Sequence, residues 1–231
     1  MSIIGETMDY GPCAFMNVYD PDTVFSSIDK NGRYSFGNQP RITHWNLVVL
    51  ANALIPIISN KKEKSIEMVT EVLNEFSRIF SERWYEMMYK KLGIMNPSGE
   101  DKELVDSLLD LMNDEKADYT NTFAALTLNT ESDDSLFKSN EFKRWKKQWK
   151  SRVHFSNGSL ESLKLMQTQN PLLIPRNFLV EIALNNTENG SYDEFNDLLK
   201  LVSNPYDYKS KYKFQVNPEG FDDTYETFCG T

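Results

Sequence analysis

The sequence predicts a mainly α-helical globular protein, with a long loop before the helices and an extended segment after them. From about residue 40 onward, apolar residues recur at steps of three and four, the period of an amphipathic helix. The first 40 residues are instead rich in Gly, Pro, Asp and Ser, and residues 204–231 are interrupted by Asn-Pro and Pro-Glu-Gly. We therefore expect a structured loop over 1–40, a helical lobe over 41–203 and a tail over 204–231 that packs back on the lobe.

The first expected helix covers residues 42–58 and follows Pro40. Its apolar residues at four-residue steps are Trp45, Val49, Ala53 and Ile57. Two leucines lie on the same broad stripe. This pattern predicts a buried helix.

Similar periodicity predicts further helices along the chain. In the fifth of them, Pro175 would lie in the first turn, where a missing N–H costs nothing. Residues 113–118 are expected to be the exit from the helix over 103–112 and the approach to residues 119–126. The expected helices are 65–92, 103–112, 136–152, 159–167, 174–184 and 192–202.

Composition excludes several classes of protein. The 231 residues are 40% hydrophobic and 26% charged, which is ordinary for a globular protein. There are 34 acidic against 25 basic residues, a net charge of -9, so the average surface repels phosphate backbones and anionic lipid, and we expect no nucleic acid partner. The longest strongly apolar stretch, 47–58, contains Asn52 and Pro56 and is too short to cross a bilayer. We expect no membrane span.

The strongest local charge feature is residues 141–152. Six basic residues surround Trp145 and Trp149, which stand one helical turn apart. Basic residues interleaved with aromatics can bind RNA, a phosphate-rich ligand or a calmodulin-like partner. On a helix, however, the two Trp would form a buried stripe and the Lys and Arg a solvated face. We favour this second interpretation.

The two cysteines, Cys13 and Cys229, lie at opposite ends of the chain. Neither stands in a CxxC motif, and the two His lie far from both, so a zinc set is not recognisable. From the residues alone, they are either two unrelated thiols or a long-range disulfide. The chain also has no GxGxxG, GxxxxGK[ST], GxSxG or HExxH motif.

Asp9 stands in the short stretch Asp-Tyr-Gly-Pro. Such a stretch is usually a turn, in which Asp caps, Gly takes a positive φ and Pro ends the element. Its functional interpretation is the metal-binding Asp of a kinase-like fold, which follows a short strand and holds the ion that bridges ATP phosphates. Residues 2–8 do carry a short strand-like pattern.

A series of stretches in the same order resembles the selenoprotein O family: MSIIGETMDYGPCAFM, THWNLVVLANALIPI, DYTNTF, RWKKQW, NPLLIPRN, NPYDY and YETFCGT. The resemblance covers essentially the whole chain and begins just after the family's catalytic loop. It implies the large helical C-terminal lobe of a protein-kinase-like fold, with a short strand near residues 2–9. It also implies an ATP-binding protein adenylyltransferase, in which a Ser, Thr or Tyr hydroxyl of a protein substrate attacks the α-phosphate of a flipped ATP and releases pyrophosphate.

Carried over residue by residue, the resemblance makes Asp9 the metal-binding Asp. It would hold Mg²⁺ or Mn²⁺ against the phosphates of ATP. The family's catalytic Asp, a second metal-binding Asn and the phosphate-contacting Lys all precede the position that matches Met1. We therefore expect no catalytic residue in this chain, and no AMP transfer by the chain alone.

Three further expectations follow from the resemblance. Cys13 and Cys229 match the activation segment and the family terminus, where animal members carry selenocysteine, which implies a redox-sensitive bridge between them. Eukaryotic relatives are typically mitochondrial, so that location is expected if the source is eukaryotic. Arg176 and Asn177 precede Phe178, where many members have a polar residue, and we expect them to fix a helix start.

The alternative to an enzyme is a non-enzymatic helical module that binds a partner through 145–152 or the aromatic tail.

Overall fold

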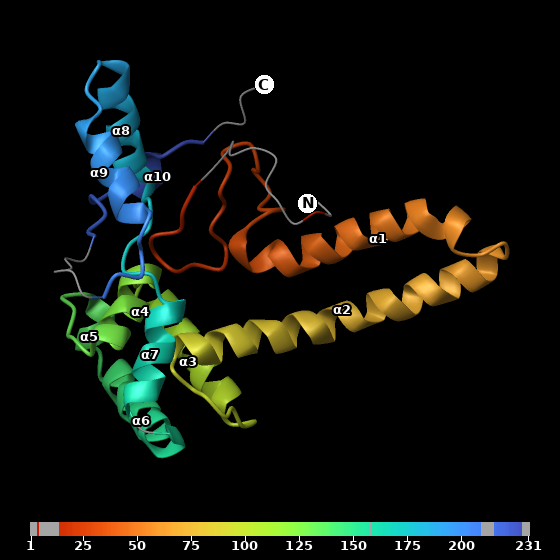
Figure 1. Cartoon of the computed structure of the whole chain (residues 1–231), viewed down its shortest axis with the longest axis horizontal. Helices are drawn as coiled ribbons and strands as arrows, with labels where there is room; N and C mark the ends of the chain where they lie inside the picture. Colours follow the sequence, from red (N-terminus) through yellow and green to blue (C-terminus); the bar gives the residue numbers. More distant parts are fainter. Residues whose placement is uncertain (1–3, 5–13, 158, 209–214, 228–231) are drawn as a thin grey trace. The chain divides into compact units, whose positions relative to one another are not determined.

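A computed structural model describes residue 4 and residues 14–157, 159–208 and 215–227, without the side chains of 154–159. The described chain is mainly helical, which confirms the predicted class (Figure 1). In these ranges the only β-pairing is one antiparallel bridge, between Val18 and Asp118. The strand expected near residues 2–9 lies outside the described residues, apart from Ile4 in a turn. The described helices are the 3-10 turn η1 (Phe36–Asn38), α1 (Gln39–Ile58), α2 (Lys62–Lys91), α3 (Asp101–Asp114), α4 (Tyr119–Leu128), α5 (Ser135–Lys138), α6 (Asn140–Asn157), α7 (Ser159–Gln169), α8 (Asn177–Glu188), α9 (Asp193–Val202) and α10 (Phe221–Thr224).

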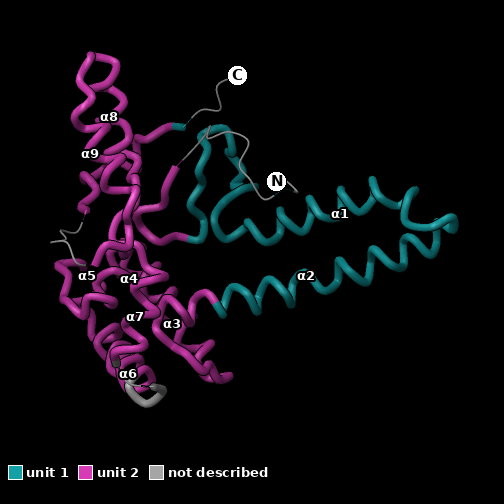
Figure 2. The backbone as a smooth tube through the Cα atoms, in the orientation of Figure 1, with its two compact units in different colours: residues 1–13, 21–86, 227–231 teal, residues 14–20, 87–226 magenta. Residues whose placement is uncertain are grey.

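The chain divides into two compact units, and both are discontinuous in sequence (Figure 2). The first contains residues 1–13, 21–86 and 227–231, and the second contains 14–20 and 87–226. Each unit is described by itself below.

The first unit is built on the hairpin of α1 and α2, which run side by side in opposite directions (Figure 1). Aromatic side chains link the two helices and line α2. The His44 ring lies 5.4 Å from Phe76, Phe76 lies 6.0 Å from Phe80, and Phe80 stacks 6.5 Å from Trp84. The loop before α1 is fixed by its own hydrogen bonds. The carboxylate of Asp29, for example, accepts from two backbone N–H groups within it.

The expectation that the first helix is buried is wrong. Trp45 is 50% exposed, Val49 48% and Ile57 78%, and only Ile42 of α1 is buried. The physical reason is that, among the described helices of the first unit, only α2 runs along α1, and it covers part of the circumference of α1. By length and composition alone, the stretch Phe36–Ile58 could also cross a membrane. This stretch is longer than residues 47–58, the apolar stretch noted in the sequence, because residues 36–46 are also largely uncharged. One such helix is weak evidence for a membrane.

The second unit has its core between the end of α2 and helices α3, α4, α6 and α7. Trp145 and Trp149 of α6 are buried and stack on each other at 5.9 Å with nearly parallel rings. Both indole N–H groups donate to backbone carbonyls on other elements, that of Leu104 and that of Leu92, each at 2.8 Å. These two bonds tie α6 to α3 and to the end of α2.

Two helix boundaries differ from those expected. The helix expected over 136–152 is broken at Ser139, whose extended backbone ends α5 and whose hydroxyl accepts from the N–H of Phe142 in the first turn of α6. The helix expected over 174–184 begins only at Asn177. Pro175 therefore precedes the helix instead of lying in its first turn, because Arg176 has an extended backbone at the N-cap position.

Helix α4, Tyr119–Leu128, covers a stretch for which no helix was expected. Its signals are local: Asp118 caps the N-terminus by accepting from the N–H of Asn121 at 2.8 Å, and Asn129 ends the helix in the left-handed conformation. Almost every side of α4 is buried, so it has no polar face from which a helical period could be recognised.

Candidate functional site

Three candidate site residues, Asp9, Cys13 and Cys229, lie outside the described residues. Within the described part of the chain, no group of three or more His, Cys, Asp and Glu side chains is placed to hold a metal ion. The described residues do show how the segment that directly follows Asp9 and Cys13 is held.

Residues 14–20 form an extended segment of the second unit. It pairs with the residues around the start of α4. The N–H of Tyr19 donates to the carbonyl of Ala117, and the N–H of Tyr119 donates to the carbonyl of Asn17, both at 2.8 Å. These bonds flank the bridge between Val18 and Asp118, so the segment is fixed in register.

Arg176 is the centre of a buried polar cluster that contacts this segment through Asn17. Its side chain is fully buried and makes two hydrogen bonds to the carboxylate of Asp118, at 2.6 and 3.0 Å. A third bond, from Nη1 at 2.7 Å, reaches the side-chain oxygen of Asn17, and Nε donates to Gln215 at 3.2 Å. A bidentate contact with a carboxylate is the strongest geometry available to Arg. One guanidinium thus joins the early segment, the cap of α4 and the tail.

Two asparagines, Asn17 and Asn177, also hold residues 14–20 in place. Together with Arg176, Asp118 and Gln215 they are called the anchor below. Asn177 pairs with the backbone of Phe15, donating to its carbonyl at 3.0 Å and accepting from its N–H at 2.8 Å. The side-chain amide of Asn17 donates to both carboxylate oxygens of Asp222, at 2.8 and 3.1 Å. The interpretation of Arg176 and Asn177 as residues that fix a helix start is therefore incomplete. Neither side chain caps α8, and both hold residues 14–20.

Burial shifts the pKa of titratable groups beside the anchor. The ring of Tyr119 lies 5.8 Å from that of Tyr19, and burial raises the pKa of both phenols. The amine of Lys91 lies over the rings of Phe123 and Tyr119, at 4.5 and 5.5 Å. Burial lowers its pKa to about 8, because the cation loses its hydration. These three titratable groups lie in the core, and as described they form no arrangement of nucleophile and base.

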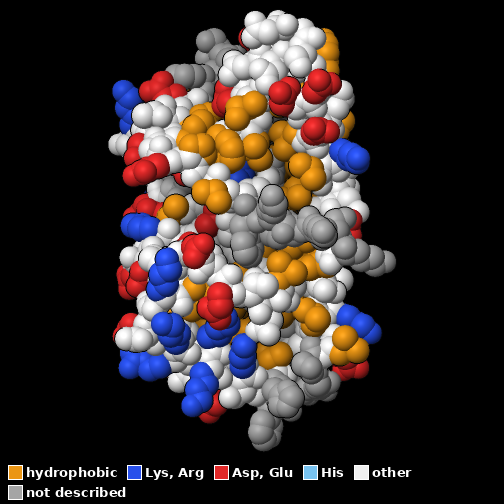
Figure 3. Space-filling model, turned by 90° about the vertical axis from the view of Figure 1, so that its left-hand side faces the viewer, with side chains coloured by type: hydrophobic (Ala, Val, Ile, Leu, Met, Phe, Trp, Pro, Cys, Tyr) orange, Lys and Arg blue, Asp and Glu red, His pale blue; other side chains and the backbone are white. Residues whose placement is uncertain are grey.

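The basic stretch of α6 follows the favoured interpretation for its aromatic residues. Both Trp are buried, and Lys and Arg side chains gather over the lower part of the face in Figure 3, where Figure 1 places α6. Two basic residues are not on the solvated face. Lys146 is largely buried and pairs with Glu131 at 3.1 Å, and Arg152 binds the buried carboxylate of Asp101 at 2.6 Å. Because both indoles are buried, neither Trp145 nor Trp149 offers a surface platform on which the bases of a nucleic acid could stack.

Comparison with known proteins gives a consistent result. Residues 1–203 match the family model described as protein adenylyltransferase SelO. The chain is 47% identical to the protein nucleotidyltransferase YdiU of Clostridium beijerinckii, 48% to that of Clostridium botulinum and 46% to that of Pelagibacter ubique. Each match covers 100% of this chain and 48% of the relative.

The chain therefore spans about half the length of the curated relatives it matches. These relatives are bacterial and lend no support to a mitochondrial location. The family match is broad: it takes in Asp9, the segment 14–20 and the anchor residues Asp118, Arg176 and Asn177. The chain belongs to the SelO family of protein adenylyltransferases, which are nucleotidyltransferases.

Proposed function

We propose that this chain is the C-terminal part of an enzyme that transfers AMP from ATP to Ser, Thr or Tyr hydroxyls of protein substrates. The observation that carries the proposal is the family match over residues 1–203. The anchored segment 14–20 supports it, because a metal-binding Asp needs a fixed backbone and this segment begins five residues after Asp9.

In this proposal Asp9 binds Mg²⁺ or Mn²⁺ in the complete enzyme. When bound, the ion neutralises charge on the phosphates of ATP during transfer. Arg176 and Asn177 act as positioning residues, because they hold the backbone that follows the ligand. The nucleotide clamp and the catalytic Asp are supplied by the part of the relatives that this chain does not match, so the 231-residue chain alone transfers no AMP.

A chimera tests the proposal. The matching half of the Clostridium beijerinckii relative is replaced by this chain, and incorporation of label from α-labelled ATP into protein is measured with Mg²⁺ or Mn²⁺. We expect labelling by the chimera and none by the 231-residue chain. Asp9→Asn in the chimera should lower the rate at least about 100-fold, the loss typical when one preorganised electrostatic group is removed.

The matched control is Asp133→Asn, which changes the same functional group at an exposed position of the second unit. It should leave labelling within about twofold of the parent chimera. Labelling by the isolated chain would show that it needs no further clamp. A folded chimera that does not label, or one indifferent to Asp9→Asn, would contradict the proposed function.

We also propose that Cys13 and Cys229 form a redox-sensitive bridge. Asn17, four residues after Cys13, donates to Asp222, seven residues before Cys229, and this contact supports the proposal. Peptide mass spectrometry of the unreduced protein tests this directly. A linked peptide that disappears with reductant is expected under oxidising conditions, and its absence there would rule the bridge out.

A further inference from the structure

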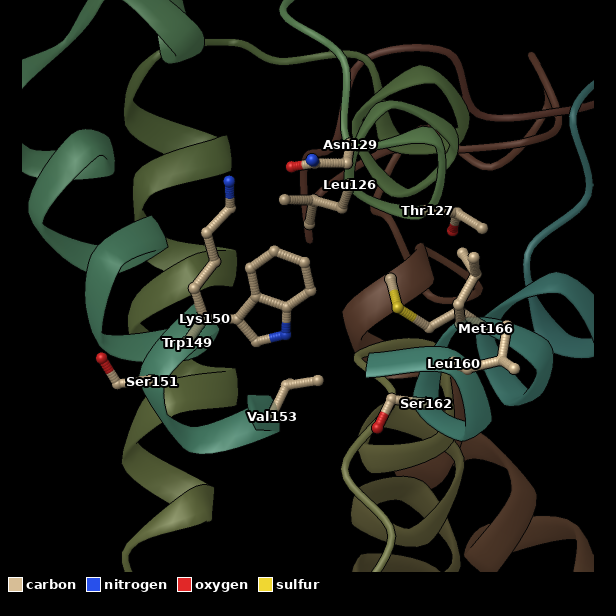
Figure 4. A pocket seen from close by; sticks show the side chains of 11 residues that line it. Leu126, Thr127, Asn129, Trp149, Lys150, Ser151, Val153, Leu160, Ser162 and Met166 are labelled. Carbon is tan, nitrogen blue, oxygen red and sulfur yellow. The ribbon is translucent and has the colours of Figure 1, made fainter. Parts of the chain in front are cut away.

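The second unit contains a cavity of about 600 Å³ between helices α4, α6 and α7 (Figure 4). Its wall on the α6 side is the indole of Trp149, which faces the thioether of Met166 on α7. The volume is within the range of sites that hold small organic molecules. The cavity shares no lining residue with the anchor around Arg176, so the proposed AMP transfer gives it no role.

Contacts behind the lining hold these walls in place. The N–H of Trp149 donates to the carbonyl of Leu92, and its ring stacks on that of Trp145. Met166 packs against Gly93, whose φ of +69° favours glycine and where an added Cβ would lie 3.0 Å from the Met166 side chain. Trp149 and Met166 are therefore each held by contacts on the side that faces away from the cavity. The cavity between them has a defined shape because both walls are held in place.

Among the described residues, the lining is mainly apolar and contains one charged residue, Lys150. None of the described lining residues is a carboxylate, although the whole chain carries a net charge of -9. Ser162 adds a polar group. It is 1% exposed, and within the described part of the chain its hydroxyl has no hydrogen-bond partner. The Thr127 hydroxyl, by contrast, is already bound to the carbonyl of Phe123 and to Asn170.

We propose that this cavity binds a small, flat, largely apolar molecule that carries one carboxylate. The aromatic part would lie against the indole face of Trp149 and the apolar wall of α7. The Lys150 amine at the edge would attract the carboxylate. The absence of lining carboxylates is what favours an anion over a cation. The site is separate from AMP transfer and does not depend on it.

The test uses 2-naphthoate as the probe, titrated into the 231-residue chain by calorimetry. We expect saturable binding of one molecule per chain. The uncharged 2-naphthamide should bind at least about threefold more weakly than 2-naphthoate. The Lys150→Gln variant should likewise bind 2-naphthoate at least about threefold more weakly, because each change removes one partly exposed ionic contact. Leu160→Trp and Val153→Phe narrow the cavity from two sides, and at least one should weaken binding tenfold or more.

Two matched controls separate this site from nonspecific binding. Lys147→Gln removes a neighbouring charge of α6 that does not line the cavity, and Val72→Lys changes the apolar groove of the α1–α2 hairpin. Both should bind 2-naphthoate as the parent does. Absence of saturable binding, full binding by both narrowed variants, or loss of binding in Val72→Lys would overturn the site. Equal binding of the acid and the amide would overturn its preference for an anion.

Discussion

The α1–α2 hairpin and the core of the second unit carry similar apolar stripes and bury them very differently. In the hairpin, Trp45 is half exposed and Val72 is 73% exposed. In the core, Trp145 and Trp149 are nearly fully buried, and each indole N–H has a partner. Apolar residues recur at helical spacing in both α1 and α6, so this spacing reports only that a helix has an apolar face. Whether that face is covered depends on how many elements surround the helix.

The hairpin consequently has an apolar groove of about 490 Å³ along its two helices, lined by side chains such as Leu50, Leu54, Val69 and Leu73. In the core, polar side chains instead pair with one another, as Arg152 does with Asp101 and Arg176 with Asp118. Stability should therefore be sensitive to single side chains in the core and tolerant in the hairpin.

The largest effect is expected for Arg176→Ala. It leaves the carboxylate of Asp118 without its bidentate partner and frees Asn17, so the free energy of unfolding should fall by about 3–5 kcal/mol. Urea unfolding followed by circular dichroism measures this. The control Arg144→Ala removes a solvent-exposed pair with Glu141 and should cost less than about 1 kcal/mol. Equal losses in the two variants would mean that the cluster around Arg176 is not a buried anchor.

An intermediate effect is expected at Lys91, whose cation is buried in the core. Because its pKa is lowered to about 8 in the folded state from 10.5, the unfolded state binds more protons between these values. The free energy of unfolding should therefore rise with pH from about 8 toward 10.5, and the cost of the buried cation is fully present below pH 8. Lys91→Met should stabilise the protein at pH 7 by about 2 kcal/mol.

The measurement is urea unfolding at pH 7 and 9.5. The gain from Lys91→Met should be smaller at pH 9.5, because the wild-type lysine is then largely neutral when folded. Lys64→Met, at an exposed position of the hairpin, serves as the control and should show neither the gain nor its pH dependence. A Lys91→Met variant that is less stable at pH 7 would show that the amine is better solvated than its burial indicates.

The smallest effect is expected for Val72→Lys in the hairpin. The side chain is 73% exposed, so the free energy of unfolding should change by less than about 0.5 kcal/mol. Urea unfolding combined with sedimentation velocity checks this. A loss above about 2 kcal/mol, accompanied by a change in sedimentation, would show that the groove is covered by a second copy in solution and would break the contrast between the two regions.

Helices with a clear apolar stripe were predictable from the sequence. The expected 65–92 and 103–112 correspond to α2 and α3, with boundaries that differ by a few residues. Helix α4 was not predictable in this way, because Phe123, Ala124, Ala125 and Leu126 are all buried and leave no alternation. For such a helix the usable signals were the Asp118 cap and the Asn129 stop.

The anchor could not be predicted from local pattern at all. Arg176 follows Pro175 near a helix start, and nothing in the neighbouring residues indicates that its partner is Asn17, 159 positions earlier. The resemblance to a known family did mark its stretch, NPLLIPRN, as a landmark. The resemblance did not explain what Arg176 does in this stretch. Its role is visible only in the structure, where residues 14–20 and α8 belong to the same unit.

Residues 14–20 also impose an order on folding during synthesis. The carboxylate that binds Asn17 belongs to Asp222, which is synthesised 205 residues later. At 5–20 residues per second, about 10–40 seconds pass before that partner exists. Until then Asn17 lacks Asp222, and before residue 176 has been made it also lacks its guanidinium partner. The second unit therefore cannot close fully until both Arg176 and Asp222 have followed residues 14–20 out of the ribosome.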